Sequence, residues 1–336
     1  MLAIPLEIYG LVAEYVSRDD LINLSCVSLD FRIEFERLLY RTIQVQKYTP
    51  TTDRLLERIS GTPRLSLSVR TFHIIFKDKI QSHTTRKLSS TLRAMKNLTE
   101  LHFVGHNLQV HVLTRQCTFQ LHGFKYLENA PRGSATKSLG NFLLLQPLIR
   151  HLSIPIYDNA VLLPSDMLPH LDTLDAPGFL ATALDINRRP IQRLRWRSDQ
   201  SYLKLHGAFS TILVLVINDY PNKVDFPAQF PNLRLLECQM RLKHVSSLAL
   251  FHMKGWSFNT IQDKLASIVG LHYLHTLRDS GGLTVDFDTQ EVDSIWQGLG
   301  DVMKSLYLVQ VGTLQRHRGG QLESRQDAQP WYEWMV

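Results

Sequence analysis

The stretch "IQRLRW" (residues 191–196) has the pattern apolar-x-x-Leu-x-apolar, and this strand motif recurs along most of the chain. The second apolar position of the clearest copies falls at residues 152, 174, 194, 215 and 236, which are spaced 20 to 22 residues apart. Earlier copies centre on Phe72 and Leu101, a weaker copy lies near Phe119–Phe124, and a late copy centres on Leu306. A period of this length that persists over successive copies indicates a repeat architecture.

Each strand motif predicts a short strand, and helix signals lie between the copies. Leu88, Leu92 and Met95 are spaced i, i+4, i+7 just before the motif "LTELHF" (98–103). Asp288 and Glu291 have the spacing of a capping box ahead of an apolar helical stripe. One strand and its return cannot bury an apolar face alone, whereas stacked units share a continuous core. The sequence therefore predicts an α/β solenoid with parallel strands, and its period falls in the range of leucine-rich repeats.

The repeat is irregular in two places. A polar stretch, "APRGSATK" (130–137), lengthens the spacing after Phe124. Between Cys238 and Met303 the motif is degenerate, with "HVSSLALF" (244–251) and "LHYLHTL" (271–277) as partial candidates. After residue 312 the sequence is mostly polar, and we expect a C-terminal tail over residues 313–336.

The first 45 residues carry three short amphipathic stretches. The first has apolar residues at helical spacing from Ile8 to Val16, and the second is expected to be capped by Asp19 or Asp20. Ser28 is expected to cap the third, which carries Phe31, Phe35, Leu38 and Leu39 on one stripe. Three helices this short have more apolar positions than they can bury among themselves, so we expect an exposed apolar patch that serves as an interface.

This segment resembles the F-box. The resemblance is carried by "IPLEI" (4–8), "DLINLSCVS" (20–28), Phe31 and "LLYRTIQV" (38–45), with isoleucine at position 4 where leucine is usual. It implies docking on a Skp-family adaptor protein, and through that adaptor on a cullin-type ubiquitin ligase. The residues that the resemblance assigns to adaptor binding are Ile4, Pro5, Ile8, Val12, Leu21, Leu24 and Val27.

The body of the chain is similar to fungal F-box proteins with irregular leucine-rich repeats. The similar stretches are "SLGNFLLLQPLIRHLSIP" (138–155), "LPHLDTLDAPGFLATAL" (168–184) and "RPIQRLRW" (189–196). The two resemblances together imply a three-helix F-box (1–45), a leucine-rich-repeat horseshoe (46–312) and the polar tail (313–336). The implied function is substrate recognition for a ubiquitin ligase. The alternative is a leucine-rich scaffold without a ligase role, whose N-terminal helices only cap the solenoid.

A substrate site is suggested by three arginines on one predicted strand. In the copy centred on Leu194, the apolar residues face the core, so Arg193, Arg195 and Arg197 share the opposite face. The repeat spacing places Asp175 and Val216 beside the middle arginine. Arginine pairs well with carboxylate or phosphate oxygens, so we expect an acidic or phosphorylated segment of the substrate there. The alternative is a solvated face whose charges are paired locally.

The composition and the motifs present limit the other classes of function. The chain is 44% hydrophobic and 20% charged, as in a globular protein, and its longest strongly apolar run is "ILVLVI" (212–217). Its three cysteines lie too far apart for a disulfide framework or a zinc site. The sequence contains no phosphate loop, nucleophile elbow or HExxH helix. The pair His102 and His106 fits ordinary repeat positions better than a metal site. The net charge of +6 comes without a long basic stripe. We therefore expect no catalytic residue, no cofactor, no membrane or nucleic-acid partner, and a location in the cytoplasm or nucleus.

Overall fold

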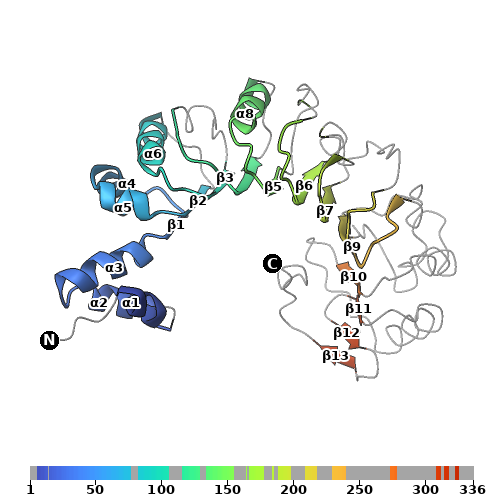
Figure 1. Cartoon of the computed structure of the whole chain (residues 1–336), viewed down its shortest axis with the longest axis horizontal. Helices are drawn as coiled ribbons and strands as arrows, with labels where there is room; N and C mark the ends of the chain where they lie inside the picture. Colours follow the sequence, from blue (N-terminus) through green and yellow to red (C-terminus); the bar gives the residue numbers. More distant parts are fainter. Residues whose placement is uncertain are drawn as a thin grey trace. The chain divides into compact units, whose positions relative to one another are not determined.

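The computed structural model describes residues 6–13, 15–76, 82–105, 116–128, 134–154, 164, 166–177, 184, 188–197, 209–217, 229–239, 273–277, 308–311, 314–317 and 322–324. The chain divides into two compact units, Met1–Leu171 and Asp172–Val336. Each unit is described by itself below, with the element labels of Figure 1.

Unit 1 begins with three short helices, α1 (Leu6–Ala13), α2 (Arg18–Leu24) and α3 (Leu29–Leu39), where the sequence predicts them. Ser28 caps α3 as predicted, accepting a hydrogen bond from the backbone N–H of Phe31 at 3.2 Å. The cap predicted for α2 was wrong. Ser17 occupies that position, because its hydroxyl accepts from the N–H of Asp20 at 3.2 Å and donates to the Asp20 carboxylate at 2.7 Å.

Five parallel strands follow in unit 1, and each pairs with the next in chain order. They are β1 (Thr42–Val45), β2 (Thr71–Phe76), β3 (Glu100–Gly105), β4 (Gly123–Glu128) and β5 (His151–Ser153). The register aligns Phe72, Leu101, Phe124 and Leu152, which are the central positions of successive strand motifs. The predicted repeat of parallel strands is therefore confirmed in this unit.

The helices between these strands lie on one side of them (Figure 1). They are α4 (Pro50–Gly61), α5 (Pro63–Ser68), α6 (Ser82–Ala94) and α8 (Ser134–Leu144). Phe72, Ile74, Leu101 and Phe103 are completely buried, and the predicted stripe of Leu88, Leu92 and Met95 is buried with them. The core therefore forms from one face of each strand and the helices that return the chain.

Unit 2 continues the same pattern with six parallel strands. They are β6 (Thr173–Pro177), β7 (Arg193–Arg197), β8 (Val214–Ile217), β9 (Leu235–Gln239), β10 (Tyr273–Leu277) and β11 (Leu308–Val311). The register aligns Leu174, Leu194, Leu215 and Leu236 as the repeat predicts. β10 lies within "LHYLHTL", whereas "HVSSLALF", the capping-box helix after Asp288 and the centre of the late copy, Leu306, lie outside the described residues.

The ends of the predicted domains look different in the structure. β1 forms the last residues of the segment expected to be the F-box, yet it pairs with β2 as a strand of the repeat sheet. The expected polar tail contains two strands, β12 (Leu314–His317) and β13 (Leu322–Ser324), which extend the sheet from β11 in antiparallel fashion. The structure thus shows open, mainly parallel sheets with helices. The N-terminal helices α1, α2 and α3 and the first strands belong to the same compact unit.

Candidate partner-binding surfaces

The exposed apolar side chains of the described residues are concentrated at the N-terminus. Of the twelve large apolar side chains that are exposed, eight lie on or between α1, α2 and α3, with exposed fractions from 42% to 90%. We call this set the N-terminal apolar surface: Ile8, Leu11, Val12, Tyr15, Ile22, Val27, Leu29 and Ile33. An apolar group of this size on such a small segment is typical of a partner interface.

The surface is exposed because the three helices enclose only a small interior. Tyr9 of α1 packs on Phe31 of α3 with ring centroids 4.8 Å apart, and Phe31 packs on Phe35 at 5.3 Å. Phe35 is completely buried, whereas α2 contributes no buried residue. One aromatic cluster therefore joins α1 to α3, and most of the other apolar side chains of the three helices face solvent.

The structure places the residues that the F-box resemblance assigns to adaptor binding in different environments. Ile8, Val12 and Val27 are exposed members of the N-terminal apolar surface, and Leu21 and Leu24 are half-buried on α2. Ile4 and Pro5 lie outside the described residues. The predicted set did not include five members of this surface, which are Leu11, Tyr15, Ile22, Leu29 and Ile33. A signal was present for Leu11 and Tyr15, because both lie on the helical stripe predicted between Ile8 and Val16.

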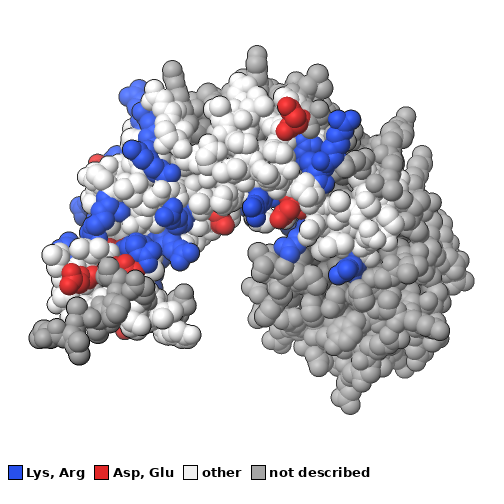
Figure 2. Space-filling view, in the orientation of Figure 1, with Lys and Arg blue, Asp and Glu red and all other residues white. Residues whose placement is uncertain are grey.

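α3 is joined to the first repeat by a carboxylate at which three arginines meet. Glu36, whose side chain is only 7% exposed, forms ion pairs with Arg32 of α3, Arg58 of α4 and Arg64 of α5. Burial raises the pKa of Glu36, but the hydrogen bonds and charges of Arg64 and Arg32 outweigh it and hold the pKa below the usual value. Figure 2 shows the basic side chains gathered over this part of unit 1. No local sequence pattern predicts this cluster.

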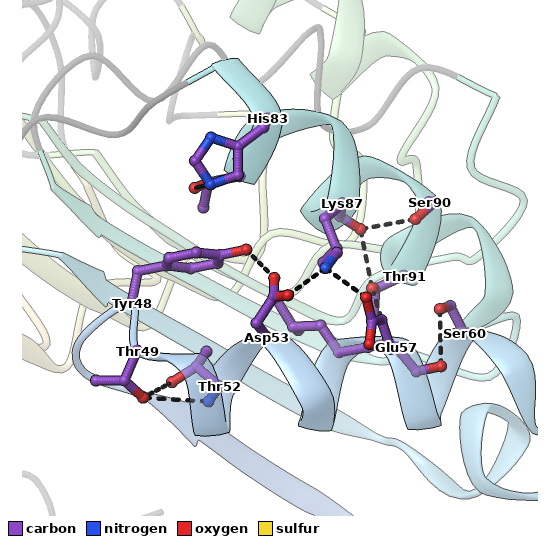
Figure 3. A network of polar contacts seen from close by, with 12 residues as sticks. Tyr48, Thr49, Thr52, Asp53, Glu57, Ser60, His83, Lys87, Ser90 and Thr91 are labelled. Carbon is purple, nitrogen blue, oxygen red and sulfur yellow. Dashed lines mark hydrogen bonds and ion pairs between the residues drawn. The ribbon is translucent and has the colours of Figure 1, made fainter.

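A second polar network ties α4 to α6 (Figure 3). The ammonium of Lys87 on α6 donates to Asp53 and, at 2.7 Å, to Glu57 on α4, and the hydroxyl of Tyr48 donates to Asp53. The hydrogen bond from Lys87, followed by that from Tyr48, lowers the pKa of Asp53. Since the carboxylates hold the lysine charged and the lysine holds Asp53 ionised, this network cross-links two helices and presents neither a free base nor a nucleophile.

The face of the sheet opposite the helices carries an aligned polar row in unit 1. His73 on β2, His102 on β3 and Lys125 on β4 are register partners, and all three are half-buried. The two imidazole rings are stacked, with centroids 4.1 Å apart and planes 6° from parallel. We call these three residues the histidine row. Burial lowers the pKa of both histidines, and the pKa of His102 falls to about 4 with further contributions from His73 and Lys125.

The histidine row was not predicted, although the sequence contains a signal for it. His73 and His102 occupy the same position in successive strand motifs, so the repeat alignment alone places them side by side. Stacked rings do not converge on one point as metal ligands do, and no group of three potential ligands was found among the described residues. His106, the other residue of the pair considered for a metal, lies outside the described residues.

The three arginines of the predicted substrate site lie on β7. Arg195 is the register partner of Asp175 on β6 and of Val216 on β8, as the repeat spacing predicts. Arg193 and Arg195 are half-buried, and both, like Asp175, already take part in a non-covalent interaction. Arg197 ends the strand opposite Pro177.

One neighbour on that face differs from the expectation of an open surface. Val216 is only 3% exposed, although the strand alternation places it on the same face as Arg195. The face of β8 that was expected to be open is therefore covered at this position. A substrate site at the arginines stays a prediction.

Comparison with known proteins does not assign the chain to a family, since no family model and no curated protein matches it. None of the helices in the described part of the chain is long and apolar enough to cross a membrane.

Proposed function

We propose that this chain is a substrate-recognition adaptor of a cullin-type ubiquitin ligase. The N-terminal helices act as an F-box that docks on a Skp-family adaptor, and the strand repeats act as leucine-rich repeats that hold a protein substrate. The observation that carries this proposal is the N-terminal apolar surface. Ile8, Val12 and Val27 are exposed there, and the resemblance to the F-box assigns the same three residues to adaptor binding.

The physical contribution of such an adaptor is proximity. A folded partner that covers the N-terminal apolar surface removes it from water, at roughly 25 cal/mol for each Å² of apolar area buried. A substrate held by the repeats is then tethered near the ubiquitin carrier, which raises its effective concentration without any catalytic group on this chain. The partners in this proposal are the Skp-family adaptor, the cullin that it binds, and the substrate, and the complex works in the cytoplasm or nucleus.

A second candidate function is a scaffold in which the N-terminal helices only cap the repeats. Two observations favour it: Glu36 joins α3 to α4 and α5, and β1 directly continues the segment into the sheet. A cap, however, is expected to direct its apolar side chains toward the repeats. The exposure of Val27 and Leu29 is therefore better explained by docking on another protein.

The two functions are separated by a charge placed on the N-terminal apolar surface. The Val27→Asp variant of the full chain should bind a purified Skp-family adaptor at least about tenfold more weakly, because the partner would desolvate the new carboxylate. Leu145→Asp is the matched control, since Leu145 is equally exposed in unit 1 but lies after α8. Calorimetric titration measures both, and urea unfolding shows that each variant is folded.

The control variant should bind the adaptor as the wild type does. If Val27→Asp and wild type bind equally, or if neither binds, the ligase function is wrong and the scaffold function stands.

A further inference from the structure

The strands β2, β3 and β4 present a second surface, on the face opposite the helices (Figure 1). Alternate residues of each strand lie on this face, in the pairs His73 and Ile75, His102 and Val104, and Lys125 and Leu127. All six side chains are half-buried, whereas their neighbours Phe72, Ile74, Leu101 and Phe103 are completely buried on the helix side. The two faces of the sheet are thus distinct in chemistry.

The parallel register arranges the six residues in two rows. His73, His102 and Lys125 form the histidine row, and Ile75, Val104 and Leu127 form an apolar row beside it. Adjacent members of a row are about 4.8 Å apart, and the rows are two residues apart along the strands, roughly 6.5 Å. The surface therefore offers hydrogen-bond donors and, at a fixed distance, an apolar strip.

Two polar groups of the histidine row lack a hydrogen-bond or ion-pair partner among the described residues. Nε2 of His73 is buried and makes no hydrogen bond, which is uncommon for a buried polar atom. Lys125 makes no ion pair within the described part of the chain. An anionic oxygen on this row would pair with the ammonium of Lys125, whereas Nε2 of His73, which is buried and two strands away, could donate to the same ligand only if its ring turned outward.

We propose that this face binds an extended acidic segment of a protein partner, whose carboxylate lies on the histidine row and whose apolar side chain two residues away lies on the apolar row. In an extended peptide, side chains i and i+2 point the same way and are about 6.5 Å apart, which equals the separation of the rows. The site follows from this geometry and does not depend on the proposed ligase function.

Binding of a carboxylate at this face is coupled to protons. The charged and titratable groups that surround the stacked rings on this face are Glu100 on β3, Lys125 on β4 and His151 on β5, while β1 contributes the neutral Gln44. Burial lowers the pKa of His73 and His102, and the charge of Lys125 lowers both further, while Glu100 raises that of His73. A carboxylate brought by the partner raises the pKa of both rings. The complex therefore takes up protons, and affinity increases as the pH falls.

The test uses the full chain and two labelled peptides, three copies of Glu-Thr-Leu-Ser and three copies of Gln-Thr-Leu-Ser. Fluorescence anisotropy at pH 7.5 and pH 5.5 gives the affinity of each. We expect the Glu peptide to bind more tightly, and its advantage over the Gln peptide to increase at the lower pH. The increase stays well below the tenfold limit of a one-unit pKa change, because the pKa of His102 in the free chain is about 4, below both test values. The double variant His73→Gln, His102→Gln should lose this growth.

Lys125→Met should weaken the Glu peptide at both pH values, and Lys96→Met is the matched control, because Lys96 is exposed outside this face. Equal binding of the two peptides, absence of binding, or growth that persists in the double histidine variant would overturn the proposal. If that double variant does not fold, Lys125→Met decides. An unchanged affinity for the Glu peptide in this variant overturns the site, and a loss that Lys96→Met does not show supports it.

Discussion

The helices α2 and α6 of unit 1 are used in opposite ways. α6 buries Leu88 and Leu92 together with three small polar residues, whereas α2 buries nothing, although it carries Leu21, Ile22 and Leu24. Apolar sequence is therefore not sufficient for burial within the chain. The first repeat has a strand layer to pack on, whereas the N-terminal helices pack mainly on one another, and α3 also contacts α4 and α5. The difference agrees with the proposal that a partner covers α1 and α2, whereas α6 is already packed within the chain.

The largest expected effect on stability comes from truncating a side chain in the buried core of the first repeats. Phe72→Ala removes a completely buried ring and should lower the free energy of unfolding by about 3–5 kcal/mol. Val27→Ala, on the exposed side, should change it by less than about 0.5 kcal/mol. Urea unfolding of the isolated full chain measures both. Similar losses for the two variants would mean that the N-terminal helices form part of the core.

The parts of the fold that follow a local pattern were predictable from the sequence. The strand motif repeats every 20 to 22 residues in its clearest copies, so the strands centred on Leu174, Leu194 and Leu215 and their register could be predicted. The antiparallel pair β12 and β13 could not, because the polar sequence after residue 312 lacks the apolar motif. Hydrophobic periodicity reports which residues pack inward and contains no information on edge strands that pair through the backbone.

The candidate sites were predictable only in part, for a related reason. Ile8, Val12 and Val27 follow from helical spacing and the F-box resemblance. The ion pairs of Glu36 with Arg58 and Arg64 join residues 22 and 28 positions apart, so they depend on how the helices pack. The pair His73 and His102 belongs to successive repeats and becomes visible only when the repeats are aligned with one another.

A smaller effect than that of Phe72→Ala is expected from acid at the histidine row. The pKa of His102 is about 4 in the folded chain against 6.5 for an ordinary histidine, with burial as the main cause. Between these values the unfolded chain binds more protons than the folded chain, so the free energy of unfolding falls as the pH drops from 6.5 toward 4, by up to about 3 kcal/mol.

Replacing the titrating ring should remove this part of the acid sensitivity. His102→Gln should flatten the stability curve between pH 6.5 and pH 4 relative to wild type, whereas His122→Gln, at an exposed position, should leave the curve unchanged. Thermal unfolding over this pH range makes the measurement. An identical slope in wild type and His102→Gln would show that the fold does not hold this ring neutral.

The smallest expected effect on stability concerns Glu36, which connects the N-terminal helices to the first repeat. Glu36→Gln keeps the size of the side chain but removes the charge that Arg32, Arg58 and Arg64 share. The three arginine side chains are between 42% and 56% exposed, so water screens their repulsion and the loss should be only about 1–2 kcal/mol. The pKa of Glu36 is lowered in the folded chain, so its contribution to the free energy of unfolding is present above the ordinary value of 4.5 and is lost as the pH falls through the folded pKa. The stability of the variant should therefore differ from that of wild type more at pH 7 than in strong acid. Hydrogen exchange locates the effect, because amides of α3 should exchange faster in Glu36→Gln while amides of β2 and β3 should not. The control is Glu57→Gln, which removes one of the two carboxylates bound to Lys87 and should leave exchange in α3 unchanged. Equal acceleration in α3 and in the strands would contradict the connection, because it would mean that the helices and the first repeat unfold as one unit.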